Sequence, residues 1–206
     1  MSKKAKPKPE VHEYQAEMQK LLEILVHSLY TEREIFLREL VSNASDALSK
    51  VQLTTLTEEK VLDKDTELQI TISLDEEQRK IVIEDSGCGM TKEELVENLG
   101  TIANSGTLKY LEQLKTENKS AENLIGQFGV GFYSVFMVAD RVELTTRSWQ
   151  EDAKAWQWSS EGGGQYEIIP VDFKQRGTRV TVFLKEDAKE FCSEWRLESI
   201  IKKYSN

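Results

Sequence analysis

Residues 38–47 read RELVSNASDA, and they lie in the stretch that decides the fold. Around them, apolar side chains recur at the spacing of one helical face: Leu37, Leu40, Val41, Ala44, Leu48 and Val51. A capping-box pair, Thr31 and Glu34, predicts where this helix begins. Four polar side chains fall on one narrow stripe opposite the apolar face: Glu39, Asn43, Asp46 and Lys50. The stretch therefore predicts an amphipathic helix whose polar face carries reactive groups.

The rest of the chain alternates between helical and strand patterns. Helices are predicted over residues 18–29, 91–99, 133–138 and 193–204, and strands over residues 68–74, 81–83, 142–147, 155–159, 166–169 and 178–184. Because strands that follow one another in sequence are often neighbours, we expect a largely antiparallel sheet with helices on one face. The predicted fold class is therefore a two-layer α+β sandwich.

The length of 206 residues fits one large domain. The first residues hold four lysines and two prolines without an apolar run, so we expect a disordered tail over residues 1–16. The domain then spans residues 17–206. Glycines bracket a loosely patterned segment at about residues 100–131, which is typical of a mobile lid.

Charge and composition exclude several classes of function. The formal net charge of −9 disfavours a general nucleic-acid binder or a protein that binds anionic membranes. The sequence has no apolar run of the roughly 18 residues that a membrane span needs. The two cysteines are far apart, which fits neither a disulfide framework nor a metal site and favours a reducing cytoplasm.

The polar stripe of the first motif suits phosphate chemistry. Glu39 could hold an attacking water and accept its proton. Asn43 offers an amide oxygen, a ligand type that Mg²⁺ accepts. The alternative is that the stripe is only a solvated helix face.

A second motif, DSGCGM, occupies residues 85–90 at the end of a predicted strand. An ionised carboxylate only accepts hydrogen bonds, so Asp85 could receive one from an exocyclic amino group such as that of adenine. Gly87 and Gly89 would let a planar base lie against the backbone. The alternative is a simple turn.

A third motif, GQFGVGF, occupies residues 126–132. It matches neither the P-loop nor the dinucleotide fingerprint. Backbone N–H groups of a glycine run that opens a helix can nevertheless bind phosphate. The alternative is a flexible loop. Together, the three motifs supply what binding and hydrolysing a nucleoside triphosphate requires.

In these motifs the sequence resembles the amino-terminal ATPase domain of the ninety-kilodalton heat-shock chaperones, bacterial type. That family belongs to the GHKL superfamily with DNA gyrase, mismatch-repair ATPases and histidine kinases, and its domain has the Bergerat ATP-binding fold. The resemblance runs from about Glu17 to Tyr204 and includes residues 29–34, 36–48, 85–95, 98–103, 105–107 and 126–134.

The resemblance implies a role for individual residues. Glu39 would be the catalytic base, Asn43 the Mg²⁺ ligand and Asp85 the acceptor for the adenine amino group. Further nucleotide-binding residues would be Asp46, Ala47, Lys50, Gly89, Met90, Asn98, Leu99, Ser105, Gly106, Gly126, Gln127, Gly129, Val130, Gly131, Phe132 and Thr178. Asn104 departs from the family, which usually carries lysine or arginine there, so a phosphate contact at this position is not expected.

The implied function is an Mg²⁺-dependent ATPase domain of a cytoplasmic chaperone, with ATP or ADP as its ligand. Clients and a homodimer partner would bind through domains absent from this sequence, so the isolated domain should be mainly monomeric and weakly active. Two alternatives remain: a kinase core that passes phosphate to a histidine, and a nucleotide sensor without catalysis.

Overall fold

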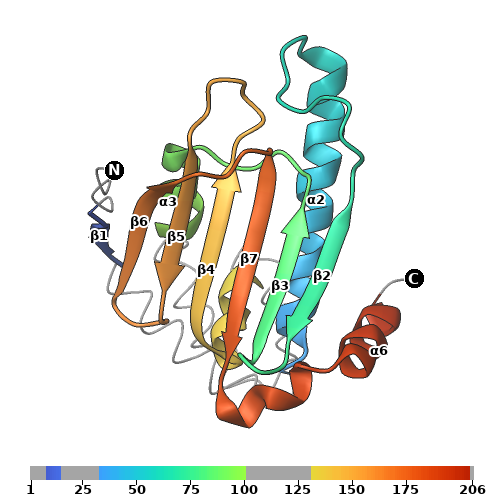
Figure 1. Ribbon diagram of the computed structural model, residues 1–206, viewed down its shortest axis with the longest axis vertical. Coiled ribbons are helices and arrows are strands. Elements are labelled where there is room, and N and C mark those ends of the chain that lie inside the picture. Colours follow the sequence, from blue (N-terminus) through green and yellow to red (C-terminus); the bar gives the residue numbers. More distant parts are fainter. Residues whose placement is uncertain (1–7, 15–32, 101–130, 205–206) are drawn as a thin grey trace, which may run out of the picture.

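The computed structural model describes residues 8–14, 33–100 and 131–204. These residues form an α+β fold around one seven-stranded sheet in the order β1-β6-β5-β4-β7-β3-β2 (Figure 1). Every neighbouring pair is antiparallel. The strands are β1 (Glu10–Glu13), β2 (Ile70–Asp75), β3 (Lys80–Asp85), β4 (Ala139–Arg147), β5 (Ala155–Ser160), β6 (Gln165–Val171) and β7 (Gly177–Leu184). The predicted fold class is therefore confirmed.

Helices cover one face of the sheet and leave the other open. They are α2 (Ile35–Thr57), α3 (Lys92–Gly100) and the 3₁₀ helix η1 (Gly131–Met137). The 3₁₀ helix η2 (Glu186–Phe191) follows β7, and α6 (Glu194–Tyr204) lies beside the β2 edge of the sheet (Figure 1). Figure 1 looks at the open face, with α2 and α3 behind the strands. Side chains alternate between the faces of a strand, so Ile81 and Ile83 of β3 pack into the core while Val82 faces outward.

Helix α2 follows its predicted apolar pattern. Leu37, Leu40, Ala44 and Val51 are buried, whereas Leu48 is only partly buried. Glu34 lies directly before α2, and its carboxylate contacts α6. Glu34 Oε1 accepts from Lys203 Nζ at 2.5 Å, and Oε2 accepts from Arg196 at 3.1 Å. Thr31, the other half of the predicted capping box, lies outside the described residues.

A capping box formed by Thr91 and Glu94 starts α3. The Glu94 N–H donates to Thr91 Oγ1 at 3.2 Å, and the Thr91 N–H donates to Glu94 Oε2 at 2.8 Å. The reciprocal bonds satisfy donors that the first turn of a helix leaves unpaired. The helix predicted over residues 133–138 is instead the 3₁₀ helix η1, which begins two residues earlier.

Strand β1 corrects the prediction of a disordered tail over residues 1–16. Residues Glu10–Glu13 pair with β6 at the edge of the sheet. His12 stacks on Tyr166 with ring centroids 5.0 Å apart, and Tyr14 is buried. The sequence EVHE shows no apolar alternation. This strand is held by backbone pairing and ring stacking rather than by an apolar face.

Other predictions fall on residues whose structure is not described. They are the helix over residues 18–29 and nearly all of the lid, so both of these stay predictions. Among the described helices, none combines the length and the apolar character that crossing a membrane demands.

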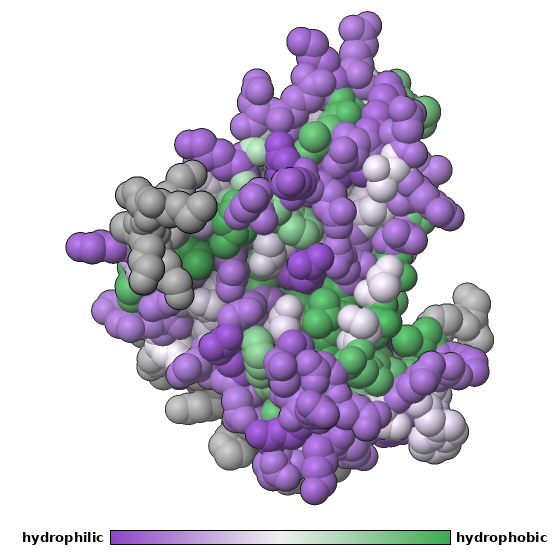
Figure 2. All heavy atoms as spheres, in the orientation of Figure 1, coloured by the Kyte–Doolittle hydropathy of each residue, from purple (hydrophilic) through white to green (hydrophobic). Residues whose placement is uncertain are grey.

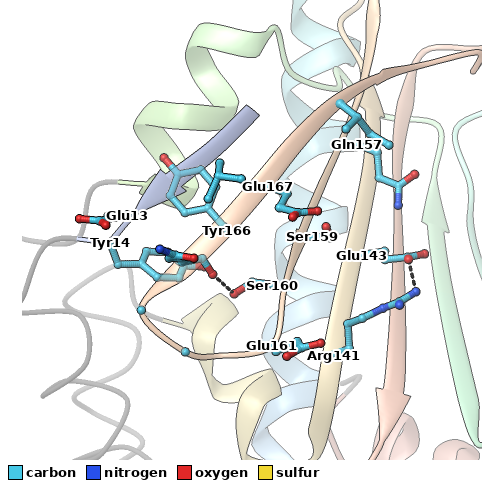
Figure 3. A pocket seen from close by; sticks show the side chains of 15 residues that line it. Glu13, Tyr14, Arg141, Glu143, Gln157, Ser159, Ser160, Glu161, Tyr166 and Glu167 are labelled. Carbon is cyan, nitrogen blue, oxygen red and sulfur yellow. Dashed lines mark hydrogen bonds and ion pairs between the residues drawn. The ribbon is translucent and has the colours of Figure 1, made fainter. Parts of the chain in front are cut away.

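The open face of the sheet is mostly hydrophilic, with smaller hydrophobic areas among the polar side chains (Figure 2). A groove of about 1090 Å³ crosses it near β1. Its walls carry the carboxylates of Glu13, Glu143, Glu161 and Glu167, and Arg141 forms an ion pair with Glu143 (Figure 3). Because these side chains face away from the helices, the groove is separate from the polar stripe of α2.

Candidate functional site

A second cavity, of about 540 Å³, lies between the helices and the sheet. It is lined by every predicted site residue that the structure describes: Glu39, Asn43, Asp46, Ala47, Lys50, Asp85, Gly89, Met90, Asn98, Leu99, Gly131, Phe132 and Thr178. The other predicted residues lie outside the described part of the chain: Ser105, Gly106, Gly126, Gln127, Gly129 and Val130. Five separate segments of the chain thus line one cavity.

The polar stripe of α2 forms one wall of this cavity. Glu39, Asn43, Asp46 and Lys50 all line it, as the helical wheel requires of residues on a common face. Asn43, Asp46 and Lys50 are exposed, and Glu39 is only partly so. The stripe therefore faces a cavity large enough for a ligand, rather than being only a solvated helix surface.

The Glu39 carboxylate is hydrogen-bonded at one oxygen and lies close to the backbone of Gly131 at the other. Arg38 donates to Glu39 Oε1 from Nη2 at 3.0 Å and from Nε at 3.2 Å. On the other side, a Cβ added to Gly131 would lie 2.1 Å from Glu39 Oε2. The start of η1 therefore approaches Glu39 so closely that only glycine leaves its carboxylate in place.

Asp85 is a buried carboxylate at the end of β3. It is 7% exposed, and its Oδ1 accepts the Gly87 N–H at 2.8 Å. Burial raises the pKa of Asp85 to about 6, while backbone N–H groups of Gly87 and Thr178 and the charge of Arg176 oppose this rise. At neutral pH the side chain is mostly ionised, and an ionised carboxylate can accept a donor from a ligand in the cavity.

The glycines after Asp85 are required by close packing. A Cβ at Gly87 would lie 2.6 Å from Cβ of Ala47 on α2. Gly89 has a φ of +57°, and its Cβ would lie 1.8 Å from the Arg147 carbonyl oxygen. No other residue fits at these positions without a shift of the backbone, so the turn brings β3, α2 and β4 together below the cavity.

One buried side chain that sequence reasoning missed organises the floor of the site. Thr146 on β4 is fully buried, and its Oγ1 accepts the Met90 N–H at 3.0 Å. The same hydroxyl bonds the Gly177 carbonyl at 3.0 Å and the Thr178 hydroxyl at 3.1 Å. It joins the turn after β3 to β7, two segments that are far apart in sequence.

The sequence analysis also did not predict several other residues that line the cavity, although a sequence pattern indicates some of them. Ile83, Leu144 and Val180 face the cavity as inward members of alternating strands, a signal that the sequence does contain. Cys88 also lines it. The remaining lining residues are Leu40, Ser42, Ala44 and Glu94.

Comparison with known proteins identifies the family. The sequence profile described as "Histidine kinase-, DNA gyrase B-, and HSP90-like ATPase" matches residues 30–175, well over half of the chain. The chain belongs to this ATPase family. The match contains Glu39, Asn43 and Asp85, three of the residues that line the cavity.

Bacterial relatives within this ATPase family are close in sequence. The chain is 55% identical to "Chaperone protein HtpG" of Chlorobium chlorochromatii over 195 residues, which is 94% of this chain and 31% of that protein. It is 54% identical to the protein of the same name from Chlorobium phaeovibrioides, over all of this chain and 33% of that one. The protein of Desulfotalea psychrophila is 50% identical over 95% of this chain and 31% of its own length. The chain thus spans about a third of the length of the curated relatives it matches.

The donor set of the cavity limits how a metal ion could be held. Across residues 8–14, 33–100 and 131–204, no three histidine, cysteine or carboxylate side chains are grouped as metal ligands. Asn43 supplies an exposed amide oxygen on the cavity wall. This set fits a hard cation that takes most of its oxygen ligands from phosphates and water, as Mg²⁺ does.

Proposed function

We propose that this chain is the ATP-binding and ATP-hydrolysing domain of a molecular chaperone that works through an ATP-driven conformational change. One observation carries the proposal: a carboxylate from α2 and a carboxylate from the end of β3, Glu39 and Asp85, line the same cavity. Membership in the ATPase family supports ATP as the ligand. The printed name of the bacterial relatives supports the chaperone role.

Asp85 is assigned to the base of the nucleotide. Its carboxylate is buried and accepts a hydrogen bond from the adenine amino group, while Gly89 and Met90 lie against the ring. Thr178 lines the same end of the cavity because it pairs with Asp85 in the sheet. This assignment uses the one buried carboxylate of the described cavity wall for the contact that recognises adenine.

Glu39 is assigned to the reaction. It takes the proton from the attacking water, and Arg38 and the close approach of Gly131 fix its carboxylate. Asn43, one helical turn further along α2, would contribute an amide oxygen to Mg²⁺, which would supply positive charge next to the phosphates. Residues 126–132 would contact the phosphates through their backbone, and residues 100–131 would close over the nucleotide.

The proposal also covers where the protein acts and what it binds. The chain would act in the cytoplasm and bind clients and a second copy through parts of a longer protein, and the isolated domain would be mainly monomeric. Its domain would run to residue 206 and would include strand β1, Glu10–Glu13, which pairs with β6.

The test compares three activities of the purified chain: ADP binding, phosphate release from ATP, and transfer of the γ-phosphate to the protein. The proposal expects binding and slow phosphate release without a phosphorylated chain. Autophosphorylation would favour the kinase core, and binding without any phosphate release would favour a nucleotide sensor. Glu39→Ala is the matched variant, since it should stop release and preserve binding.

A further inference from the structure

Three buried polar side chains form a row across the sheet below the nucleotide cavity. Asp85 of β3 is paired with Thr178 of β7, and Thr178 is paired with Thr146 of β4. Residues directly opposite each other on neighbouring strands share a face, and this row lies on the face that the helices cover. Asp85 and Thr178 line the cavity, whereas Thr146 is fully buried and does not line it.

The contacts of the Thr146 hydroxyl determine where its proton lies. A hydroxyl has a single proton to donate and lone pairs that accept. The Met90 N–H can only donate, so Thr146 Oγ1 accepts it at 3.0 Å. The Gly177 carbonyl can only accept, so Thr146 Oγ1 donates to it at 3.0 Å. The contact between Thr146 Oγ1 and Thr178 Oγ1, at 3.1 Å, therefore needs a proton from Thr178.

The opposite direction of the Thr146–Thr178 bond would sacrifice another hydrogen bond. If Thr146 donated to Thr178, its proton would be lost to the Gly177 carbonyl. Thr146 and Gly177 are both buried, and a hydrogen bond lost between buried groups is costly because water does not replace it. The arrangement that makes all three bonds is therefore favoured. In this arrangement the Thr178 proton points at Thr146, and a lone pair of Thr178 Oγ1 is left for the cavity.

We propose that Thr146 is a positioning residue that sets the base specificity of the nucleotide site: it takes the Thr178 proton and leaves Thr178 Oγ1 facing the cavity only as a hydrogen-bond acceptor. The Asp85 carboxylate lines the same end of the cavity, and an ionised carboxylate also only accepts. This end of the cavity thus offers two neighbouring acceptors, so a bound base has to bring donors. The proposal rests on the proposed binding of an adenine nucleotide in this cavity.

Two acceptors side by side select a base with an amino group over a base with a carbonyl group. The exocyclic amino group of adenine donates hydrogen bonds. Hypoxanthine has a carbonyl oxygen at the same place on the ring, and this oxygen would meet the lone pairs of Asp85 and Thr178. A site built to bind a donor rejects the analogue that lacks it, because the buried polar groups of the site are then left unpaired. ADP should therefore bind more tightly than IDP, the corresponding hypoxanthine nucleotide.

Thr146→Val tests this role, because valine has a similar shape and lacks the hydroxyl. The Thr178 proton can then turn toward the cavity and donate to the carbonyl oxygen of IDP. The ratio of ADP affinity to IDP affinity, measured by competition against labelled ADP, should fall by about tenfold, because an acceptor of the site becomes a donor. Thr146→Ser keeps the hydroxyl and should keep the wild-type ratio.

Thr145→Val is the matched control. It removes the same hydroxyl from the preceding residue of β4, whose side chain lies on the open face of the sheet opposite Gln157. The ratio of ADP affinity to IDP affinity should stay at the wild-type value in this variant. A second measurement needs no nucleotide: proton NMR should show a slowly exchanging Thr178 hydroxyl proton in the wild type and in Thr145→Val, and this signal should be lost in Thr146→Val.

An unchanged affinity ratio in Thr146→Val, including the case in which IDP displaces ADP from neither protein, would overturn the proposal. If Thr146→Val does not fold, Thr178→Val decides. It removes the proposed acceptor, so the ratio should fall, and a ratio that rises or stays the same would overturn the proposal because Thr178 would then not act as an acceptor. If the wild type binds no ADP, the proposed function fails, whereas the exchange of the Thr178 hydroxyl proton still tests the direction of its bond to Thr146.

Discussion

Glu39 and Gly131 lie so close together that a single added carbon on Gly131 would reach within 2.1 Å of the Glu39 carboxylate. The contact joins α2 to the first residue of η1, ninety-two positions later in sequence (131 − 39). Arg38 holds the other carboxylate oxygen at 3.0 Å. Glu39 is therefore restrained in a single orientation at the cavity wall, which is what a general base requires.

Replacing Glu39 by alanine tests its role as the base. ATP binding should stay close to that of the wild type, because recognition of adenine is assigned to Asp85. Phosphate release should fall by about 10²–10⁴-fold, the usual contribution of a positioned general base. Loss of binding together with turnover would make Glu39 a structural or metal-site residue, and unchanged turnover would reject the role.

Gly131→Ala tests the restraint on Glu39 without altering its chemistry. The new methyl group would displace the Glu39 carboxylate, and a misplacement of about 1 Å in a catalytic group can cost about 10²-fold in rate. We expect the turnover number to fall far more than the affinity for ADP. Gly163→Ala is the matched control, since no atom lies within 4 Å of the Cβ that it adds. Equal turnover in the two variants would show that the Gly131 contact does not matter.

Asp85→Asn should make the nucleotide-free protein more stable at neutral pH. Burial raises the pKa of Asp85 to about 6, above the unfolded value of about 4, so the folded state binds this proton more tightly. The stability due to the proton is complete below about pH 4 and is lost as the pH rises through about 6.

Asparagine imitates the protonated side chain. The free energy of unfolding of Asp85→Asn should therefore exceed that of the wild type by on the order of 1–2 kcal/mol at pH 7.5, and the difference should shrink toward pH 4. Urea unfolding at several pH values measures it, with the exposed Asp152→Asn as control. A variant that is less stable than the wild type at pH 7.5 would contradict a raised pKa of Asp85 in the folded state.

The isolated chain should hydrolyse ATP slowly. Within the described residues, no arginine lines the cavity: Arg38 pairs with Glu39, and Arg33 pairs with Asp187 at 3.2 Å. Arginine fingers raise phosphoryl-transfer rates by about 10³–10⁵-fold, and the resemblance to the heat-shock chaperones implies that the middle domain supplies one. Phosphate release per site should therefore be much faster in a chain extended to the length of its relatives. Equal rates would mean that these 206 residues already contain the whole catalytic apparatus.

The parts of the site that sequence predicts are those set by local periodicity. The 3.6-residue repeat of α2 places Glu39, Asn43 and Lys50 on one wall, and the end of a strand places Asp85 at its rim. Long-range contacts carry no such signal. Thr146 matters because β4 brings it next to the turn after β3, and it does not stand out in its own stretch of sequence.

Strand β1 is a further example of the same limit. Its four residues, three of them polar, are held by pairing with β6 and by the stacking of His12 on Tyr166, about 150 positions away. A pattern confined to Glu10–Glu13 could not indicate a strand, because the partner that stabilises it lies in another part of the chain.

The central claim is that the cavity between α2 and the sheet binds an adenine nucleotide through Asp85. Calorimetric titration of the chain with ADP, for the wild type and Asp85→Asn, tests it most directly. We predict saturable binding of one ADP per chain and a loss of about ten- to a hundredfold in affinity in the variant, because a hydrogen bond to a charged group contributes about 1.5–3 kcal/mol. Absence of binding by the wild type, or equal affinity of the two proteins, would contradict the claim.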